Sequence, residues 1–391
     1  MSTLAGVRVS DLRGCARMVV DATIGVTGIV EAMHLTVARR SDPLEITGCV
    51  ARLVYGTIRA VTALVGHGVD AIAGAMTPLL DGQASSAQRE AAVAILNGVL
   101  GNYLADTANP LAIAMRFRRD GQPLELETAT LAALPASAKV LIFVHGLCLN
   151  DLQWARHRDD HGARLAAELG YTPVYLHYNS GLHVSTNGRR FSELIETLIG
   201  QWPVAVEELA IVAHSMGGLV ARSAYDYGTR GSCHWPSHLR KLVFLGTPHH
   251  GTALERAGNW IDAMLETSAF TAPFARLGKI RSAGITDLRF GSTRESDWRG
   301  RDRFDHRGDR PQPMPLPARV QCYAVAGTGG IGGRLLGDGL VPLESGLGDH
   351  PDPRFALAFP ETHRWVGHGL SHLDLVSRRE VYERIGDWLA S

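Results

Sequence analysis

The stretch that decides the fold is LAIVAHSMGG, residues 209–218. Its apolar first half predicts a short buried strand, and the small residues that follow predict a tight turn with Ser215 at the apex. Ala213 and Gly217 lie two residues before and after the serine, where a strand-to-helix elbow leaves no room for a larger side chain. Glycine is usual at the first of these positions, and Ala213 still meets the size requirement. The strained turn would lift the serine hydroxyl clear of the sheet.

The pattern around this stretch predicts an α/β sheet with helices on both faces. Residues 119–122 (RDGQ) predict a hairpin turn between strands expected at 111–117 and 124–128. Later strands are expected at 140–144, 173–176, 209–213, 241–245, 320–326 and 354–359. Helices are expected at about 151–169, 188–200, 216–228, 253–278 and 378–390.

Composition indicates a soluble globular protein of 391 residues, with 45% hydrophobic and 20% charged residues. The 39 basic and 39 acidic residues cancel, so we expect no nucleic-acid partner. The five cysteines lack CxxC spacing, which argues against a disulfide framework and a zinc site.

Residues 1–106 predict a helical N-terminal extension. Apolar residues recur at helical spacing in 50–76 and more weakly in 18–37, and a third helix follows from about residue 85. The alternatives are a membrane-surface anchor, a cap over the active site, an oligomer contact or an ordinary packed layer. We favour the packed layer, because no basic polar face is clear. No uninterrupted run of 18 apolar residues and no clear cleavage site are present, so we expect a cytoplasmic protein without a spanning helix or signal peptide.

A nucleophilic serine needs a base to take its proton and a carboxylate to orient that base. Asp338 is the candidate acid, because GDGLVP (337–342) follows a late strand and its glycines permit a tight turn. Glu344 and Asp349 are alternatives, and Asp338 could serve the turn alone.

The base should follow the last strand and precede the last helix. His372 in GHGLSHLD (367–374) fits best, with His368 and then His363 as alternatives. The resulting chain order is serine, aspartate, histidine.

The oxyanion site is indicated by VLIFVHGL, residues 140–147, where an apolar strand ends in His-Gly. The backbone N–H groups of Leu147 and Met216 would be the two donors. For His145 we expect a structural role in this loop, and for Cys148 no chemistry.

From about residue 140 to the end, the chain resembles the α/β-hydrolase superfamily, specifically bacterial lipases and esterases with an AHSMG elbow. Five motifs carry the resemblance in order: VHGL (144–147), AHSMGG (213–218), LGTPHHG (245–251), GDGLVP (337–342) and SHLDL (371–375). The resemblance implies that Ser215, Asp338 and His372 are catalytic in a domain spanning residues 107–391. It also implies a cap insertion at about 251–315, in which Trp260, Met264 and Leu265 would contact substrate. Residues 1–106 fall outside it.

Some such lipases bind calcium through an aspartate two residues after the catalytic histidine, and Asp374 matches that position. The other ligands cannot be placed, so we expect no metal and no cofactor. The expected function is a serine hydrolase that cleaves carboxylic esters of small-molecule or lipid-like substrates. The alternatives are an acyltransferase, thioesterase or amidase, or a non-catalytic membrane-associated binding protein.

Overall fold

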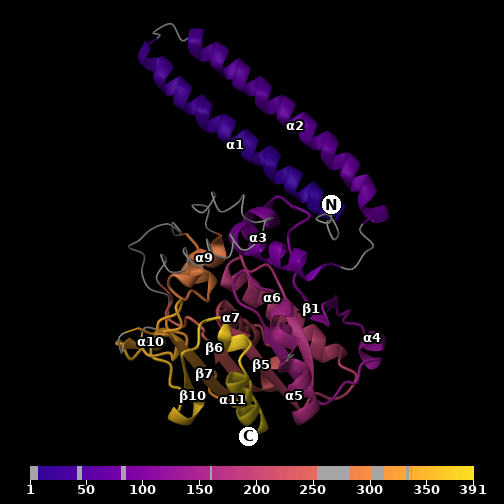
Figure 1. The fold of residues 1–391 in the computed structure, drawn as a ribbon, viewed down its shortest axis with the longest axis vertical. Coiled ribbons are helices and arrows are strands. Elements are labelled where there is room, and N and C mark those ends of the chain that lie inside the picture. Colours follow the sequence, from indigo (N-terminus) through magenta and orange to yellow (C-terminus); the bar gives the residue numbers. More distant parts are fainter. Residues whose placement is uncertain are drawn as a thin grey trace. The chain divides into compact units, whose positions relative to one another are not determined.

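The computed structural model describes residues 8–41, 46–80, 85–158, 161–252, 282–300, 312–331, 334–335 and 337–391 (Figure 1). The chain forms two compact units. The first comprises Met1–Arg89 and Leu104–Ala112, and the second comprises Glu90–Tyr103 and Ile113–Ser391. This division differs from the boundary expected at residue 106, because most of the third helix, α3 (Ala87–Asp106), packs with the second unit.

The first unit is built on two long helices, α1 (Val9–Ser41) and α2 (Ile46–Leu80), which run side by side (Figure 1). Asp70 on α2 joins them, since it accepts hydrogen bonds from Arg13 at 2.7 Å and from Arg17 at 2.5 Å. Both guanidinium groups hold the pKa of the Asp70 carboxyl well below its ordinary value. The helical character expected for this region is therefore confirmed, and the helices are longer than the apolar stripes indicated.

One segment of the described chain, Val9–Leu35 in α1, is long and apolar enough to cross a membrane. A signal sequence or a core helix can pass the same test of length and composition. The expectation of no spanning helix therefore stays a prediction, because length and composition alone do not show that α1 crosses a membrane. Asp21 interrupts the apolar run in α1, so the sequence shows no continuous apolar stretch there. The mean hydropathy of the segment is high all the same, because a mean tolerates isolated charged residues.

The second unit contains an eight-stranded sheet in the order β10-β7-β6-β5-β3-β4-β1-β2. The strands are β1 (Arg116–Arg119), β2 (Gln122–Pro123), β3 (Lys139–Val144), β4 (Tyr171–His177), β5 (Glu208–His214), β6 (Leu239–Leu245), β7 (Gln321–Thr328) and β10 (Arg364–His368). Strand β1 is antiparallel to its neighbours β2 and β4, and the pairings from β4 to β10 are parallel. This mostly parallel sheet with helices on both sides is an α/β-hydrolase fold. A separate two-stranded sheet pairs β8 (Gly330–Ile331) with β9 (Arg334–Leu335).

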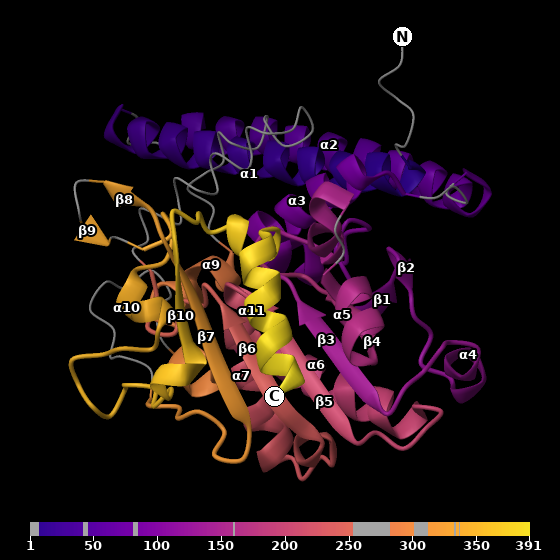
Figure 2. The same cartoon turned by 60° about the horizontal axis from the view of Figure 1, so that its bottom comes forward.

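Helices cover both faces of the large sheet (Figure 2). The α-helices of this unit after α3 are α4 (Thr128–Ala132), α5 (His161–Leu169), α6 (Val184–Gln201), α7 (Met216–Arg230), α9 (Ala283–Leu288), α10 (Leu343–Gly346) and α11 (Arg379–Ala390). The 3-10 helices are η1 (Asp151–Arg158), η2 (Trp235–Ser237), η4 (Glu295–Asp297), η5 (Glu361–His363) and η6 (Asp374–Val376). The apolar faces of α5 and α11 bury Leu165, Ile385 and Trp388 against strand residues such as Phe143 and Val243. Helices α6 and α7 pack against each other and cover the sheet from the other side.

The structure confirms the expected hairpin turn and the strands expected in 140–326. The strands beside the turn differ from the expectation, because β1 overlaps only the end of 111–117 and β2 precedes 124–128. In the hairpin, Arg119 pairs with Gln122, and Asp120 and Gly121 have positive φ angles. The strand expected at 354–359 is wrong, because the last strand of the sheet is β10. The apolar residues of the earlier segment pack inward, where Leu357 donates its N–H to Gly348 and the Phe359 ring lies 6.0 Å from that of Phe244. The helix expected at 253–278 lies outside the described residues.

Candidate active site

Ser215 occupies the sharp turn between β5 and α7. Its φ of 55° and ψ of −126° are strained for a residue with a side chain. A backbone hydrogen bond of 2.8 Å from its N–H to the carbonyl of Leu245 holds the turn. A Cβ atom at Gly217 would lie 2.6 Å from the carbonyl oxygen of His145, so the close approach of the loop after β3 explains the small residue there.

The loop after β3 reaches the serine. A Cβ atom at Gly146 would lie 2.9 Å from the Cβ of Ser215, so the two backbones are nearly in contact. Leu147, the residue that follows, is buried, and Met216 is the first residue of α7. The two candidate oxyanion residues therefore lie on the two segments that meet at Ser215.

His372 and Asp338 form a buried hydrogen-bonded pair. His372 Nδ1 lies 2.7 Å from Asp338 Oδ2, and the two side chains are 5% and 2% exposed. The other carboxylate oxygen accepts the N–H groups of Leu340 at 3.0 Å and Val341 at 2.8 Å. The N–H of His372 also donates to the backbone carbonyl of Asp338 at 3.0 Å. The carboxylate is therefore fixed by its own turn and presents its remaining oxygen to the imidazole.

The pair lies beside the serine turn at the carboxyl ends of β5, β6 and β7. A Cβ atom at Gly246, directly after β6, would lie 3.0 Å from Asp338 Oδ2 and 3.2 Å from His372 Cε1. The residue before it, Leu245, accepts the N–H of Ser215. His214 Nε2 lies 3.0 Å from the carbonyl oxygen of His372, and the two rings are 4.6 Å apart. The structure thus brings Ser215, Asp338 and His372 to one edge of the sheet.

The alternative histidines lie elsewhere. His368 is exposed at the end of β10, and His363 Nδ1 lies 3.0 Å from the carbonyl oxygen of Cys322. His145 is fully buried and stacks on Tyr178 with 4.3 Å between ring centroids. Burial lowers the pKa of His145 to about 3, so its ring is neutral and suits a structural role.

The alternative carboxylates have other contacts. Asp349 forms an ion pair with Arg364 at 2.5 Å, and Glu344 lies on α10. Asp374 accepts the N–H and the hydroxyl of Ser371 and an Arg378 guanidinium N–H, so it orders its own loop. Within the part of the chain that the structure describes, no cluster of His, Cys, Asp or Glu could hold a metal ion.

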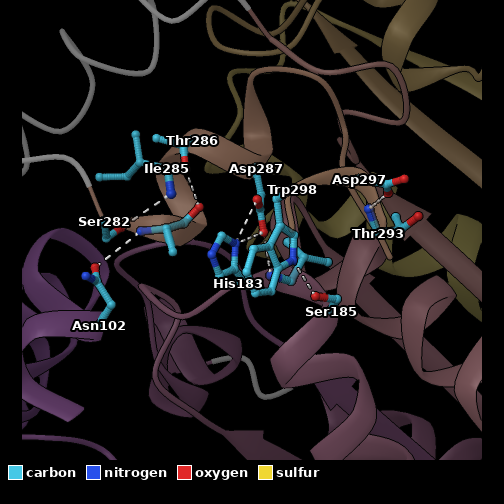
Figure 3. Close-up of polar contacts among 12 residues, drawn as sticks. Asn102, His183, Ser185, Ser282, Ile285, Thr286, Asp287, Thr293, Asp297 and Trp298 are labelled. Carbon is cyan, nitrogen blue, oxygen red and sulfur yellow. Dashed lines mark hydrogen bonds and ion pairs between the residues drawn. The ribbon is translucent and has the colours of Figure 1, made fainter. Parts of the chain in front are cut away.

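Another histidine–aspartate pair, which the sequence analysis missed, lies at the start of α6 (Figure 3). His183 Nδ1 lies 3.0 Å from Asp287 Oδ1, and Asp287 Oδ2 accepts the N–H of Val184 at 2.8 Å. The His183 ring stacks on Trp298, with centroids 3.7 Å apart. These contacts hold α9 at the start of α6. Helix α9 also lies close to the serine turn, since a Cβ atom at Gly284 of α9 would lie 3.2 Å from Met216 Cε. No local motif marks His183 or Asp287.

Helix α3 packs against the loop that holds the candidate oxyanion residue Leu147, although residues 1–106 fall outside the family resemblance. A Cβ atom at Gly98 of α3 would overlap Cys148, the residue after Leu147. Cys148 has a positive φ of 60° and donates its N–H to Ser180 Oγ at 3.1 Å. Burial raises the pKa of the Cys148 thiol to about 12, which makes it unreactive and agrees with the expected absence of chemistry.

The expected substrate-contacting residues Trp260, Met264 and Leu265 lie outside the described residues. The same holds for most of the expected cap at 251–315, of which 253–281 and 301–311 are not described.

Comparisons with known proteins leave the activity open. Residues 114–282 match a family model described as a domain of unknown function (DUF7379). No curated protein matches the chain. Among solved structures, the lipase BlEst2 of Bacillus licheniformis in its mature form is 18% identical, with a TM-score of 0.41 over 66% of this chain and 94% of that chain. Aspergillus fumigatus lipase B is 13% identical, with a TM-score of 0.41 over 69% and 59%. The Pyrococcus furiosus esterase Pf2001 is 15% identical, with a TM-score of 0.39 over 65% and 81%. At such identities and scores, the likeness carries no inference about activity.

Proposed function

We propose that the protein is a serine hydrolase that cleaves carboxylic esters. The observation that carries this proposal is the 2.7 Å contact between His372 and Asp338, placed beside a serine in a strained strand-to-helix turn. A strained serine without a base would be a weak nucleophile, and a buried His–Asp pair without a nucleophile would be structural. Together they form the arrangement that acyl transfer requires.

In the proposed mechanism, Ser215 Oγ attacks the ester carbonyl while His372 Nε2 takes its proton. Asp338 Oδ2 accepts the Nδ1–H of His372, which fixes the tautomer with a lone pair on Nε2 and stabilises the imidazolium that forms. The protonated imidazole then donates to the leaving alcohol, so that an acyl-enzyme remains on Ser215. Water attacks this ester by the same steps and releases the acid.

The tetrahedral intermediate carries a negative oxygen that needs hydrogen-bond donors. We assign this role to the backbone N–H groups of Leu147 and Met216, on the two segments that meet at Ser215. Donors in comparable sites contribute about 3 kcal/mol each to transition-state stabilisation. The contacts of Cys148 with Ser180 and α3 would hold the first donor in place.

The test is hydrolysis of p-nitrophenyl esters of increasing acyl length by wild type and Ser215→Ala. A matched control is Ser237→Ala, which removes an exposed hydroxyl on η2. We expect wild type and the control to turn over, and Ser215→Ala to lose activity with an unchanged circular dichroism spectrum. Turnover only with an added alcohol or amine would instead indicate an acyltransferase. Equal turnover by Ser215→Ala would contradict the proposal.

The first unit supports a second proposal, attachment of this enzyme to a membrane surface. Val26, Ile29 and Met33 recur at helical spacing in α1 and are exposed, within the segment that is long and apolar enough to enter a bilayer. The test is flotation of the full chain with phosphatidylcholine–phosphatidylglycerol vesicles. Ile29→Asp should reduce flotation, whereas Val204→Asp, at an exposed apolar residue of the second unit, should not. Absence of flotation by wild type would contradict attachment.

A further inference from the structure

A cavity of about 360 Å³ lies in the α/β unit apart from the candidate catalytic residues. Its lining includes Arg222 on α7, the consecutive His249 and His250 after β6, Arg289 and His350. Phe290 and Phe355 add aromatic surface. Among the described residues that line this cavity, none is an aspartate or a glutamate.

Arg222 is a buried cation, 5% exposed, without a carboxylate partner in the described chain. One terminal nitrogen donates to the carbonyl of Met314 and the other lies 3.3 Å from His249 Nδ1. Its Nε is buried and has no hydrogen-bond partner among the described residues. Burial lowers the pKa of Arg222 to about 10, which reflects the cost of an uncompensated charge.

Arg118, also buried among the described residues of this unit, shows how such a charge is ordinarily compensated. Arg118, on β1, has one nitrogen 2.9 Å from Glu90 and 3.0 Å from Asp151. Breaking such a pair leaves a buried charge and is strongly destabilising. Two carboxylates thus compensate the charge of Arg118, although its Nε, like that of Arg222, has no hydrogen-bond partner among the described residues. Arg222 has only a carbonyl and an imidazole, so its charge is not compensated there.

His249 adds a second unused donor next to Arg222. Because the guanidinium can only donate, Nδ1 of His249 accepts, and its proton is on Nε2. This Nε2 is buried and has no hydrogen-bond partner among the described residues. Burial and the charge of Arg222 hold the pKa of His249 well below its ordinary value, so the ring is a neutral donor.

We propose that this cavity binds the phosphate group of a small ligand. The Nε–H of a buried cation and the Nε2–H of a neutral imidazole, neither with an acceptor among the described residues, favour an anion rather than a metal ion. The unpartnered Nε of Arg222 and Nε2 of His249, with Thr293 and Gln312 in the same lining, can donate to separate oxygens of one anion, and phosphate offers more oxygens than a carboxylate. The volume exceeds that of the anion alone, and the aromatic lining suits the remainder of a phosphate ester.

The test is thermal unfolding of the full chain in sodium phosphate against sodium chloride at equal ionic strength. Glycerol 3-phosphate is the second probe and sodium acetate the third. We expect a saturable rise in Tm with phosphate, because a ligand that binds only the folded chain stabilises it. Arg222→Met should weaken phosphate binding about tenfold or more, since it removes a charge-assisted contact. Arg379→Met, at an exposed arginine of α11, is the matched control and should keep the wild-type response.

Arg222→Met should fold as well as wild type in chloride, because it removes an unpaired buried charge. If it fails to fold, His249→Phe provides the same comparison. Tighter binding of glycerol 3-phosphate would show that the phosphate belongs to an ester, and equal or weaker binding would indicate free phosphate. The proposal is overturned if wild type gives no saturable rise in Tm, if both cavity variants keep the full rise, or if acetate gives the same rise.

Discussion

In the α/β unit, one histidine–aspartate pair joins His372 and Asp338, and another joins His183 and Asp287. In both, Nδ1 of the imidazole contacts a buried carboxylate, at 2.7 Å in the first pair and 3.0 Å in the second. Their surroundings differ. The first ring packs beside the serine turn, whereas the second stacks on Trp298 (Figure 3).

The two carboxylates also accept their other hydrogen bonds from different parts of the chain. Asp338 accepts two N–H groups of its own turn on Oδ1, so its Oδ2 is held toward the imidazole of His372. Asp287 accepts the N–H of Val184 and so caps the first turn of α6. A His–Asp contact therefore indicates catalysis only where the other imidazole nitrogen can reach a nucleophile. We expect the first pair to control turnover and the second to control stability.

The largest expected effect is that of His372→Ala on turnover. Removing the base should lower kcat about 10⁶-fold, as in comparable triads. The paired variant is His183→Ala, which should keep most of its turnover because the ring only anchors α9 and α6. Initial rates on a p-nitrophenyl ester give both values. Comparable losses in the two variants would erase the distinction between the pairs.

Asp338→Asn should have the next largest effect. The amide keeps the shape of the side chain but no longer stabilises the imidazolium and favours the wrong tautomer, so turnover should fall about 10⁴-fold. Asp287→Asn is the matched change in the other pair. It should leave kcat close to wild type under conditions where both variants are folded. A small loss in Asp338→Asn would show that another carboxylate orients the base.

For stability we expect the opposite ranking, with larger losses from changes in the His183–Asp287 pair than in the His372–Asp338 pair. Asp287→Ala removes the partner of His183 and the acceptor for the N–H of Val184, so we expect a loss of about 3–5 kcal/mol in the free energy of unfolding. Urea denaturation followed by tryptophan fluorescence measures this loss. The control Asp374→Ala removes a carboxylate at a half-buried loop position and should cost less. An unfolding midpoint equal to wild type would show that Asp287 does not anchor α9.

The smallest expected effect is on the pH dependence of stability. Burial, and then the charge of Asp297, raise the pKa of Asp287 above its ordinary value of 3.8, although His183 opposes this. Between these two pKa values the folded chain holds a proton that the unfolded chain has lost. The free energy of unfolding should therefore fall as the pH rises through this window, by at most about 1.4 kcal/mol per pH unit. Asp287→Asn should remove this slope, and an unchanged slope would assign it to another group.

The sequence predicted the parts of the site that local spacing encodes. The small residues around Ser215 and the glycines beside Asp338 are direct requirements of tight turns, so they can be recognised without a structure. Because parallel strands end at the same edge of a sheet, placing three residues after three strands also predicted that they would meet.

Contacts between distant segments without a motif could not be predicted. His183 and Asp287 are 104 positions apart, and neither lies in a recognisable pattern. The packing of Gly98 on Cys148 depends on where α3 docks, which its apolar pattern does not specify. Alternating apolar residues at 354–359 resembled a strand, but Leu357 and Phe359 pack against a loop and another ring instead of pairing with β7.

The most direct test of the central claim, that His372 and Asp338 make Ser215 a nucleophile, is labelling by a fluorophosphonate followed by peptide mass spectrometry. The probe reacts only with an activated hydroxyl, so the account predicts one adduct, on the peptide that contains Ser215. This adduct should be absent in Ser215→Ala and strongly reduced in His372→Ala. An adduct on a different residue, or undiminished labelling of Ser215→Ala, would contradict it.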